Sequence, residues 1–168
     1  MTSYPHTKDD LLVAAIEHGC QPALRAWEEA GLSPTGHLPE DADPPALAQL
    51  GFDLAKQELR DYADLFRLTF DMFGVGTHNP RIAAAFQQFI DERRAFIARI
   101  TVAIIAGMPA RPAASADAIA AAIWGSLHGI YLQKVIDSGF DAEAAIDALR
   151  EMVFAFVTRH PIRPDEAN

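Results

Sequence analysis

One stretch decides the fold: Ala118-Ile-Ala-Ala-Ala-Ile-Trp-Gly-Ser-Leu-His-Gly-Ile-Tyr-Leu-Gln-Lys-Val-Ile-Asp137, closed by Ser138-Gly139. Its apolar residues recur at steps of three and four, which predicts an α-helix. The helix has two apolar faces instead of the usual one. The first face carries Ile119, Ile123, Leu127 and Ile130, and the second carries Trp124, His128, Tyr131 and Val135.

Small residues separate these two faces. They form a stripe that continues into two larger apolar residues: Ala118, Ala122, Gly125, Gly129, Leu132 and Ile136. Each glycine costs a helix about 1 kcal/mol relative to alanine, so we expect another helix to approach the bare backbone closely. A helix that is apolar nearly all round must be covered on more than one side. We therefore expect a second subunit to provide part of the cover.

The composition fits one folded domain over residues 1–168. Half of the 168 residues are hydrophobic and 22% are charged, which does not fit a disordered chain. Lysine and arginine number 14 against 23 acidic residues, a net charge of −9. We therefore expect no direct binding of nucleic acid, because phosphate contacts need clustered positive charge.

The chain offers no feature of a secreted or membrane protein. A single cysteine, Cys20, excludes an intramolecular disulfide. Lys8, Asp9 and Asp10 stand where a signal peptide needs an apolar run. Arg99 interrupts the richest apolar window, so no membrane span is expected. These observations favour a cytoplasmic protein.

Helix start and stop signals recur along the whole chain. Expected N-caps and first-turn prolines are Thr7, Pro45, Asn79-Pro80 and Ser115, and expected ends are Gly31, Gly74-Val-Gly76, Gly107-Met-Pro109 and His160-Pro161. Near Gly19 and Pro22, either one helix ends at His18 and another begins, or one helix continues with a kink. No segment alternates convincingly with period 2. The sequence predicts an all-α fold, a single helical bundle of about six helices.

Signatures of catalysis and metal binding are mostly missing. The histidines, at positions 6, 18, 37, 78, 128 and 160, show no i, i+4 pairing, and Glu-x-x-His does not occur. No glycine-rich phosphate loop is present. We expect no metal and no cofactor. Cys20 beside His18 is interpreted as a half-buried cysteine, with a reactive thiol as the alternative.

Two groups of residues leave a choice between core and binding site. His128 is either a core histidine bonded to a neighbouring helix, or it faces a cavity with Trp124 and Tyr131 and orients a ligand there. A cluster of phenylalanines in two adjacent helices poses the same choice, since these side chains either fill a core or line an apolar pocket. The cluster consists of Phe66, Phe70, Phe73, Phe86 and Phe89.

Three segments in order resemble one family. They are Tyr4-Pro-His-Thr-Lys-Asp-Asp-Leu-Leu12, Ala63-Asp-Leu-Phe-Arg-Leu-Thr-Phe70 and Trp124-Gly-Ser-Leu-His128-Gly129. The chain resembles the C-terminal ligand-binding and dimerisation region of tetracycline-repressor (TetR) family transcriptional regulators, in the branch with a Trp-x-x-x-His-Gly motif. In that comparison, residues 1–12 are the remnant of the junction to a helix-turn-helix reader that is expected to be absent from this chain.

The resemblance implies a pocket and a dimer. The pocket for a hydrophobic or amphipathic effector would be lined by Phe52, Phe66, Phe70, Phe86, Phe89, Ile90, Trp124, His128 and Tyr131. In the family, the last two helices of each subunit form a four-helix bundle, which here implies a homodimer interface of Ala122, Gly125, Gly129, Leu132, Ile136, Leu149, Met152, Val153 and Phe156. DNA would be reached only through an absent N-terminal module or a full-length partner.

Two other functions stay open. The first is a small all-α enzyme in the same apolar cavity, with His128 and either Asp64 or Tyr131 as acid–base residues. The second is a dimerisation module with a filled core and no ligand. A hydrophobic compound that stabilises the protein against heat would exclude the second, because a ligand of the native state must stabilise it.

Overall fold

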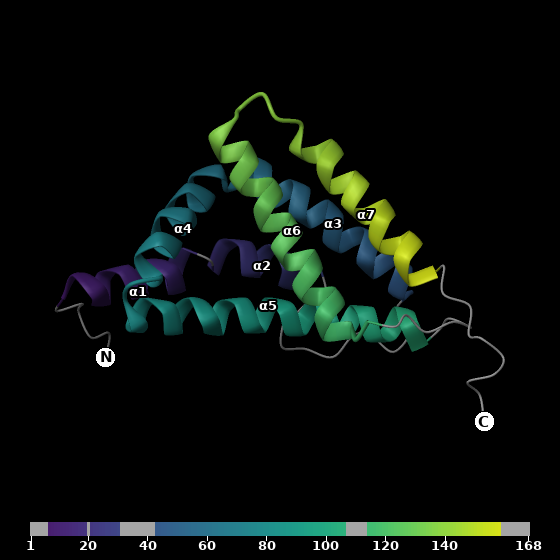
Figure 1. Ribbon diagram of the computed structural model, residues 1–168, viewed down its shortest axis with the longest axis horizontal. Coiled ribbons are helices and arrows are strands. Elements are labelled where there is room, and N and C mark those ends of the chain that lie inside the picture. Colours follow the sequence, from purple (N-terminus) through teal and green to yellow (C-terminus); the bar gives the residue numbers. More distant parts are fainter. Residues whose placement is uncertain (1–6, 20, 31–42, 107–113, 159–168) are drawn as a thin grey trace.

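The computed structural model describes residues 7–19, 21–30, 43–106 and 114–158, and in these ranges the chain is helical and has no strand. The helices are α1 (Lys8–Gly19), α2 (Gln21–Glu29), α3 (Pro44–Asp61), α4 (Ala63–Gly76), α5 (Pro80–Ala106), α6 (Ala116–Ile136) and α7 (Ala142–Thr158) (Figure 1). The predicted all-α fold is confirmed. The described part of the chain has seven helices instead of about six. The reason is that α1 and α2 are separate helices, and so are α3 and α4, which meet at Tyr62.

The expected helix caps are present. Thr7 and Asp10 bond reciprocally, with Thr7 Oγ1 accepting from the Asp10 amide at 3.1 Å and the Asp10 carboxylate accepting from the Thr7 amide at 2.9 Å. Asn79 Oδ1 accepts from the Arg81 amide at 3.1 Å, and Ser115 Oγ accepts from the Ala118 amide at 3.2 Å. Each side chain satisfies a backbone donor that the first turn of its helix leaves free.

The structure decides some of the predicted boundaries, and others lie outside the described residues. The break near Gly19 takes the form of two helices, α1 and α2, rather than one kinked helix. Helix α3 begins at Pro44, and Pro45 lies in its first turn as expected. The expected ends at Gly31, Gly107-Met-Pro109 and His160-Pro161, and Cys20, lie outside the described residues.

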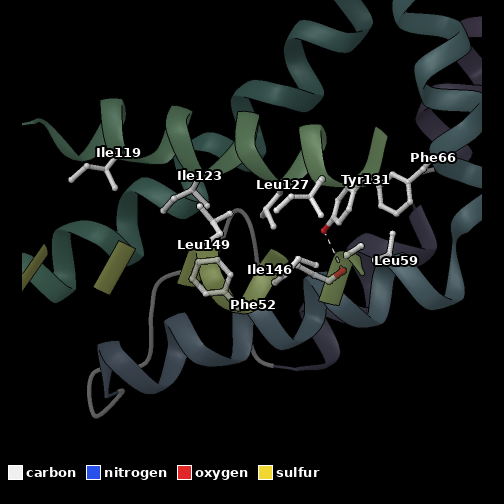
Figure 2. Close-up of a cluster of buried hydrophobic side chains, with 12 residues drawn as sticks. Phe52, Leu59, Phe66, Ile119, Ile123, Leu127, Tyr131, Ile146 and Leu149 are labelled. Atoms are coloured by element: carbon white, nitrogen blue, oxygen red, sulfur yellow. Dashed lines mark hydrogen bonds between the residues drawn. The ribbon is translucent and has the colours of Figure 1, made fainter. Parts of the chain in front are cut away.

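Helix α6 crosses the long helix α5 and then turns back into α7, which lies beside α3 (Figure 1). Its first predicted face is buried, with Ile119, Ile123, Leu127 and Ile130 all less than 10% exposed. Figure 2 shows this face packed against Phe52 and Leu59 of α3 and Ile146 and Leu149 of α7. Burial of one face of α6 thus fixes this helix against α3 and α7.

A hydrogen bond sets the register of α6 on α3. The Tyr131 hydroxyl donates to the backbone carbonyl of Ala55 at 3.2 Å, drawn as the dashed line in Figure 2. The Tyr131 ring also packs on Phe66 of α4, with ring centroids 4.3 Å apart.

Among the described helices, none combines the length and the apolar character that crossing a membrane requires.

Candidate functional site

A cavity of about 50 Å³, here called the first cavity, lies where α3, α4, α5 and α6 meet. Most of its lining is aromatic or aliphatic, and a few polar side chains converge on it. The lining residues are Trp27, Ala55, Glu58, Tyr62, Leu65, Phe66, Thr69, Phe89, Arg93, Phe96, Ile97, Trp124, Leu127, His128 and Tyr131. An apolar cavity with a few polar groups is the usual form of a small-molecule site.

The structure brings five of the nine predicted pocket residues to this cavity: Phe66, Phe89, Trp124, His128 and Tyr131. Phe52 lines a second cavity of about 70 Å³ instead. Phe70 stacks edge-on near His128, with centroids 6.4 Å apart. Phe86 and Ile90 line an open groove between α4 and α5, which also contains Phe73.

Helix α6 positions three of the lining residues together. Trp124, His128 and Tyr131 follow one another at steps of four and three, so they share one side of the helix. The Trp124 and His128 rings lie 3.9 Å apart, and the His128 and Tyr131 rings lie 5.7 Å apart. The second predicted face of α6 is therefore the aromatic wall of the first cavity.

His128 is neutral and held in one tautomer. Its Nδ1 lies 3.0 Å from the Trp124 carbonyl oxygen, and a carbonyl only accepts, so Nδ1 carries the proton. Burial lowers the pKa of His128 to about 4. The structure agrees with the cavity-facing interpretation, and the hydrogen bond goes to the residue's own helix, not to a neighbouring one.

Of the two acid–base partners considered for His128, Tyr131 lies beside it in the cavity and Asp64 does not. Asp64, whose side chain is 97% exposed, lies outside the cavity lining and is near Arg67. Burial raises the pKa of Tyr131 well above its usual value, and the charge of Glu58 acts in the same direction. No group of three metal-ligating side chains occurs among the residues that the structure describes.

A buried charge pair was missed from the sequence. Glu58 of α3 and Arg93 of α5 face the cavity with side chains 13% and 6% exposed, and Arg93 Nη2 lies 3.4 Å from Glu58 Oε1. The same oxygen accepts from Trp27 Nε1 at 2.6 Å. Burial raises the pKa of Glu58, while the positive charge of Arg93 acts against the rise.

Aromatic rings surround the guanidinium group of Arg93. Its Cζ lies 5.2 Å from the ring centroid of Trp27 and 5.6 Å from that of Phe89, both within cation–π range. A signal in the sequence was available: Arg93 stands four residues after Phe89 and three before Phe96, on the apolar side of its helix. A charge in that position is expected to be buried and paired.

The residues predicted to form a dimer interface lie in two environments. Several are exposed in the single chain, including Ile136 (76%), Met152 (62%), Leu132 (40%) and Phe156 (40%). Ala122 and Gly125 are also exposed, and Gly129 is half-buried. Leu149 is buried in the core of the chain itself, and the partly buried Val153 packs against that core. The interface is not tested by a single chain and stays a prediction.

Residues 54–158 match a family model described as the BetI-type transcriptional repressor, C-terminal. The match runs from within α3 to the end of α7 and includes the whole lining of the first cavity except Trp27. Neither a curated protein nor a solved structure matches the chain.

Proposed function

The chain belongs to the TetR-like family of BetI-type transcriptional repressors, over their C-terminal domain, and we propose that this domain senses a hydrophobic or amphipathic small molecule and forms a homodimer. The family expected from three sequence motifs is confirmed, while the Trp-x-x-x-His-Gly branch stays a prediction. Because a repressor acts on DNA, we place the protein in the cytoplasm.

The first cavity is the observation that carries this proposal. It is lined by aromatic rings, with the neutral His128 and the Glu58–Arg93 pair as its polar groups. At about 50 Å³ it has room for a few water molecules. Pockets that enclose small organic ligands measure roughly 300–1,000 Å³. An effector must therefore push the lining helices apart, which couples its binding to a change of shape.

That coupling supports a role in regulation. A ligand shifts a conformational equilibrium only by its differential affinity for the two states. In our proposal the cavity of about 50 Å³ belongs to one state and an expanded cavity to the other. DNA contacts come from a reader outside the residues that match the family model or from a full-length partner, since the net charge of −9 disfavours direct contact with phosphates.

The exposed face of α6 and α7 supports the homodimer. The stripe of small residues on α6 is open, because a Cβ atom placed at Gly125 or Gly129 would meet no described atom beyond its own helical turn within 4 Å. Leu132, Ile136 and Met152 add large exposed apolar side chains to the same two helices. Exposed large apolar side chains gathered on two helices are typical of a protein–protein contact.

Thermal unfolding in the presence of varied hydrophobic compounds tests the sensor. At least one compound should raise Tm, by about 5–10 °C at 100 times its Kd. Trp124→Ala should reduce the shift, whereas Val102→Ala, at a 56% exposed position on α5, should leave it unchanged. If no compound raised Tm, the ligand-free dimerisation module would be the better description.

A further inference from the structure

The two cavities share a wall, which bears on the shape of the effector. Four residues line both: Trp27, Phe96, Ile97 and Leu127. On α6, Tyr131 lines the first cavity, Ile123 lines the second, and Leu127 lies between them (Figure 2). The barrier is therefore one layer of side chains, not a helix backbone.

The second cavity presents no free polar side chain. It is lined by aliphatic and aromatic groups from α2, α3, α5, α6 and α7. Its one hydroxyl, that of Thr101, donates to the Ile97 carbonyl at 2.9 Å. The indole of Trp27 already donates to Glu58. A cavity of this kind accepts hydrocarbon and stays dry when empty.

One buried donor beside the first cavity, Nε of Arg93, has no partner among the described residues. The donors of three polar side chains that line this cavity are bonded to backbone carbonyls: the Thr69 hydroxyl to Leu65, Nδ1 of His128 to Trp124 and the Tyr131 hydroxyl to Ala55. Arg93 differs, because it is only 5% exposed and its buried Nε has no hydrogen-bond partner in the part of the chain that the structure describes. A buried N–H group without an acceptor is unfavourable, so a ligand that supplies one is favoured.

Charge and geometry define the ligand group that would accept a hydrogen bond from Nε of Arg93. Arg93 and Glu58 neutralise each other, so a charged ligand would add an unpaired charge to a buried site. The rings of Trp27 and Phe89 lie within contact range of the guanidinium group. The N–H bonds of a guanidinium group lie in its plane, so an acceptor approaches Nε along that plane, as the lone pair of a carbonyl oxygen can.

Building on the proposed function, we propose that the effector is a neutral carbonyl compound with a hydrocarbon tail, such as a fatty ester. Its carbonyl oxygen accepts a hydrogen bond from Nε of Arg93 in the first cavity. Its tail displaces the side chains of Phe96 and Leu127 and enters the second cavity. Neither cavity alone is large enough for such a molecule, and the two together hold its two chemically different ends.

Calorimetric titration with matched probes tests the head group. The probes are methyl esters of straight-chain acids with four to ten carbons, n-alkanes of equal heavy-atom count, free carboxylates and alkyltrimethylammonium ions. Esters should bind about tenfold more tightly than alkanes. Arg93→Lys keeps the charge beside Glu58 but removes Nε, so it should abolish the ester's advantage and leave alkane binding intact. Should Arg93→Lys fail to fold, the comparison of probes on the natural protein still decides.

Tail length tests the second cavity. Affinity should rise about fourfold for each added methylene until the second cavity is full. Ala48→Leu fills part of that cavity and should end the rise several carbons earlier. Ala46→Leu, at an exposed position on the same helix, is the matched control and should not change the series.

The outcomes separate the two proposals. If esters and alkanes bound equally, or a charged probe bound more tightly than the ester, the neutral carbonyl head would be wrong while a hydrophobic sensor remained. An unchanged tail-length series in Ala48→Leu would overturn the two-cavity placement. If no probe of any class bound, the sensor function itself would fail.

Discussion

The Trp27 indole donates a 2.6 Å hydrogen bond to Oε1 of Glu58, and so ties α2 to α3 inside the first cavity. The two residues are 31 positions apart, and Trp27 lies before the segment 54–158 that matches the family. The same carboxylate oxygen faces Arg93 of α5 at 3.4 Å. One buried oxygen therefore connects three helices.

Trp27→Phe should destabilise the protein through this carboxylate. Phenylalanine keeps much of the ring packing against Phe96, whose centroid lies 5.4 Å from that of Trp27, but it removes the donor. An unsatisfied buried acceptor costs about 1–3 kcal/mol. Urea unfolding measures the loss. The double variant Trp27→Phe/Glu58→Gln is the control, and strictly additive effects of the two changes would contradict direct coupling.

The pH dependence of stability should carry the signature of His128. Its pKa falls from 6.5 to about 4 on folding. Its contribution to the free energy of unfolding is therefore complete above pH 6.5 and is lost as the pH falls toward 4. The loss for this one group is about 3 kcal/mol across that window. Glu58 acts in the opposite direction: its pKa is raised on folding, so its contribution is complete below pH 4.5 and declines as the pH rises above that value.

Substitution of His128 separates its contribution to the pH dependence of stability from that of Glu58. The free energy of unfolding of His128→Gln should fall less between pH 6.5 and pH 4 than that of the natural protein. His78→Gln, at an exposed position after α4, is the matched control. Parallel curves for His128→Gln and the natural protein would show that His128 is not buried in its neutral form.

Direct binding to duplex DNA should be undetectable at moderate salt. The chain carries 23 acidic against 14 basic residues, and most of the phosphate affinity of a DNA-binding protein comes from clustered positive charge. Fluorescence anisotropy with a labelled duplex at several salt concentrations measures this. Saturable binding that weakens steeply with added salt would contradict the prediction.

The sequence was sufficient to predict the helices because the residues that start them and set their buried faces act locally. Thr7, Asn79 and Ser115 cap helices through bonds to the next two or three residues, which neighbouring positions alone can predict. The buried face of α6 could be predicted for the same reason, since helical spacing places Ile119 and Ile123 on one side.

The site was only partly predictable because cavities arise between helices. Phe52 and Phe66 look alike in sequence, yet the rotation of α3 and α4 directs them to different cavities. Glu58 and Arg93 were missed because a charged residue is usually assigned to the solvent side of a helix. Their pairing across 35 positions depends on how α3 packs against α5, which no local pattern encodes.

The glycines of α6 offer a direct test of the homodimer. Gly125 is exposed, and a Cβ atom placed there meets no described atom beyond its own helical turn within 4 Å, so the side chain of Gly125→Leu has room on the solvent side of a single subunit. It should even favour the helix by about 1 kcal/mol, because leucine has the higher helix propensity. In a dimer that packs on this stripe, the same side chain would hold the partner helix away.

Gly125→Leu should therefore raise the stability of the monomer and weaken self-association, a combination that ordinary misfolding cannot produce. Sedimentation velocity over a range of concentrations measures the association, and thermal unfolding measures the stability. Met152→Glu, on the exposed side of α7, should also dissociate the dimer, whereas Val102→Glu on α5 should not. If the natural protein sedimented as a monomer throughout, or if Gly125→Leu left a dimer intact, α6 would not be the interface.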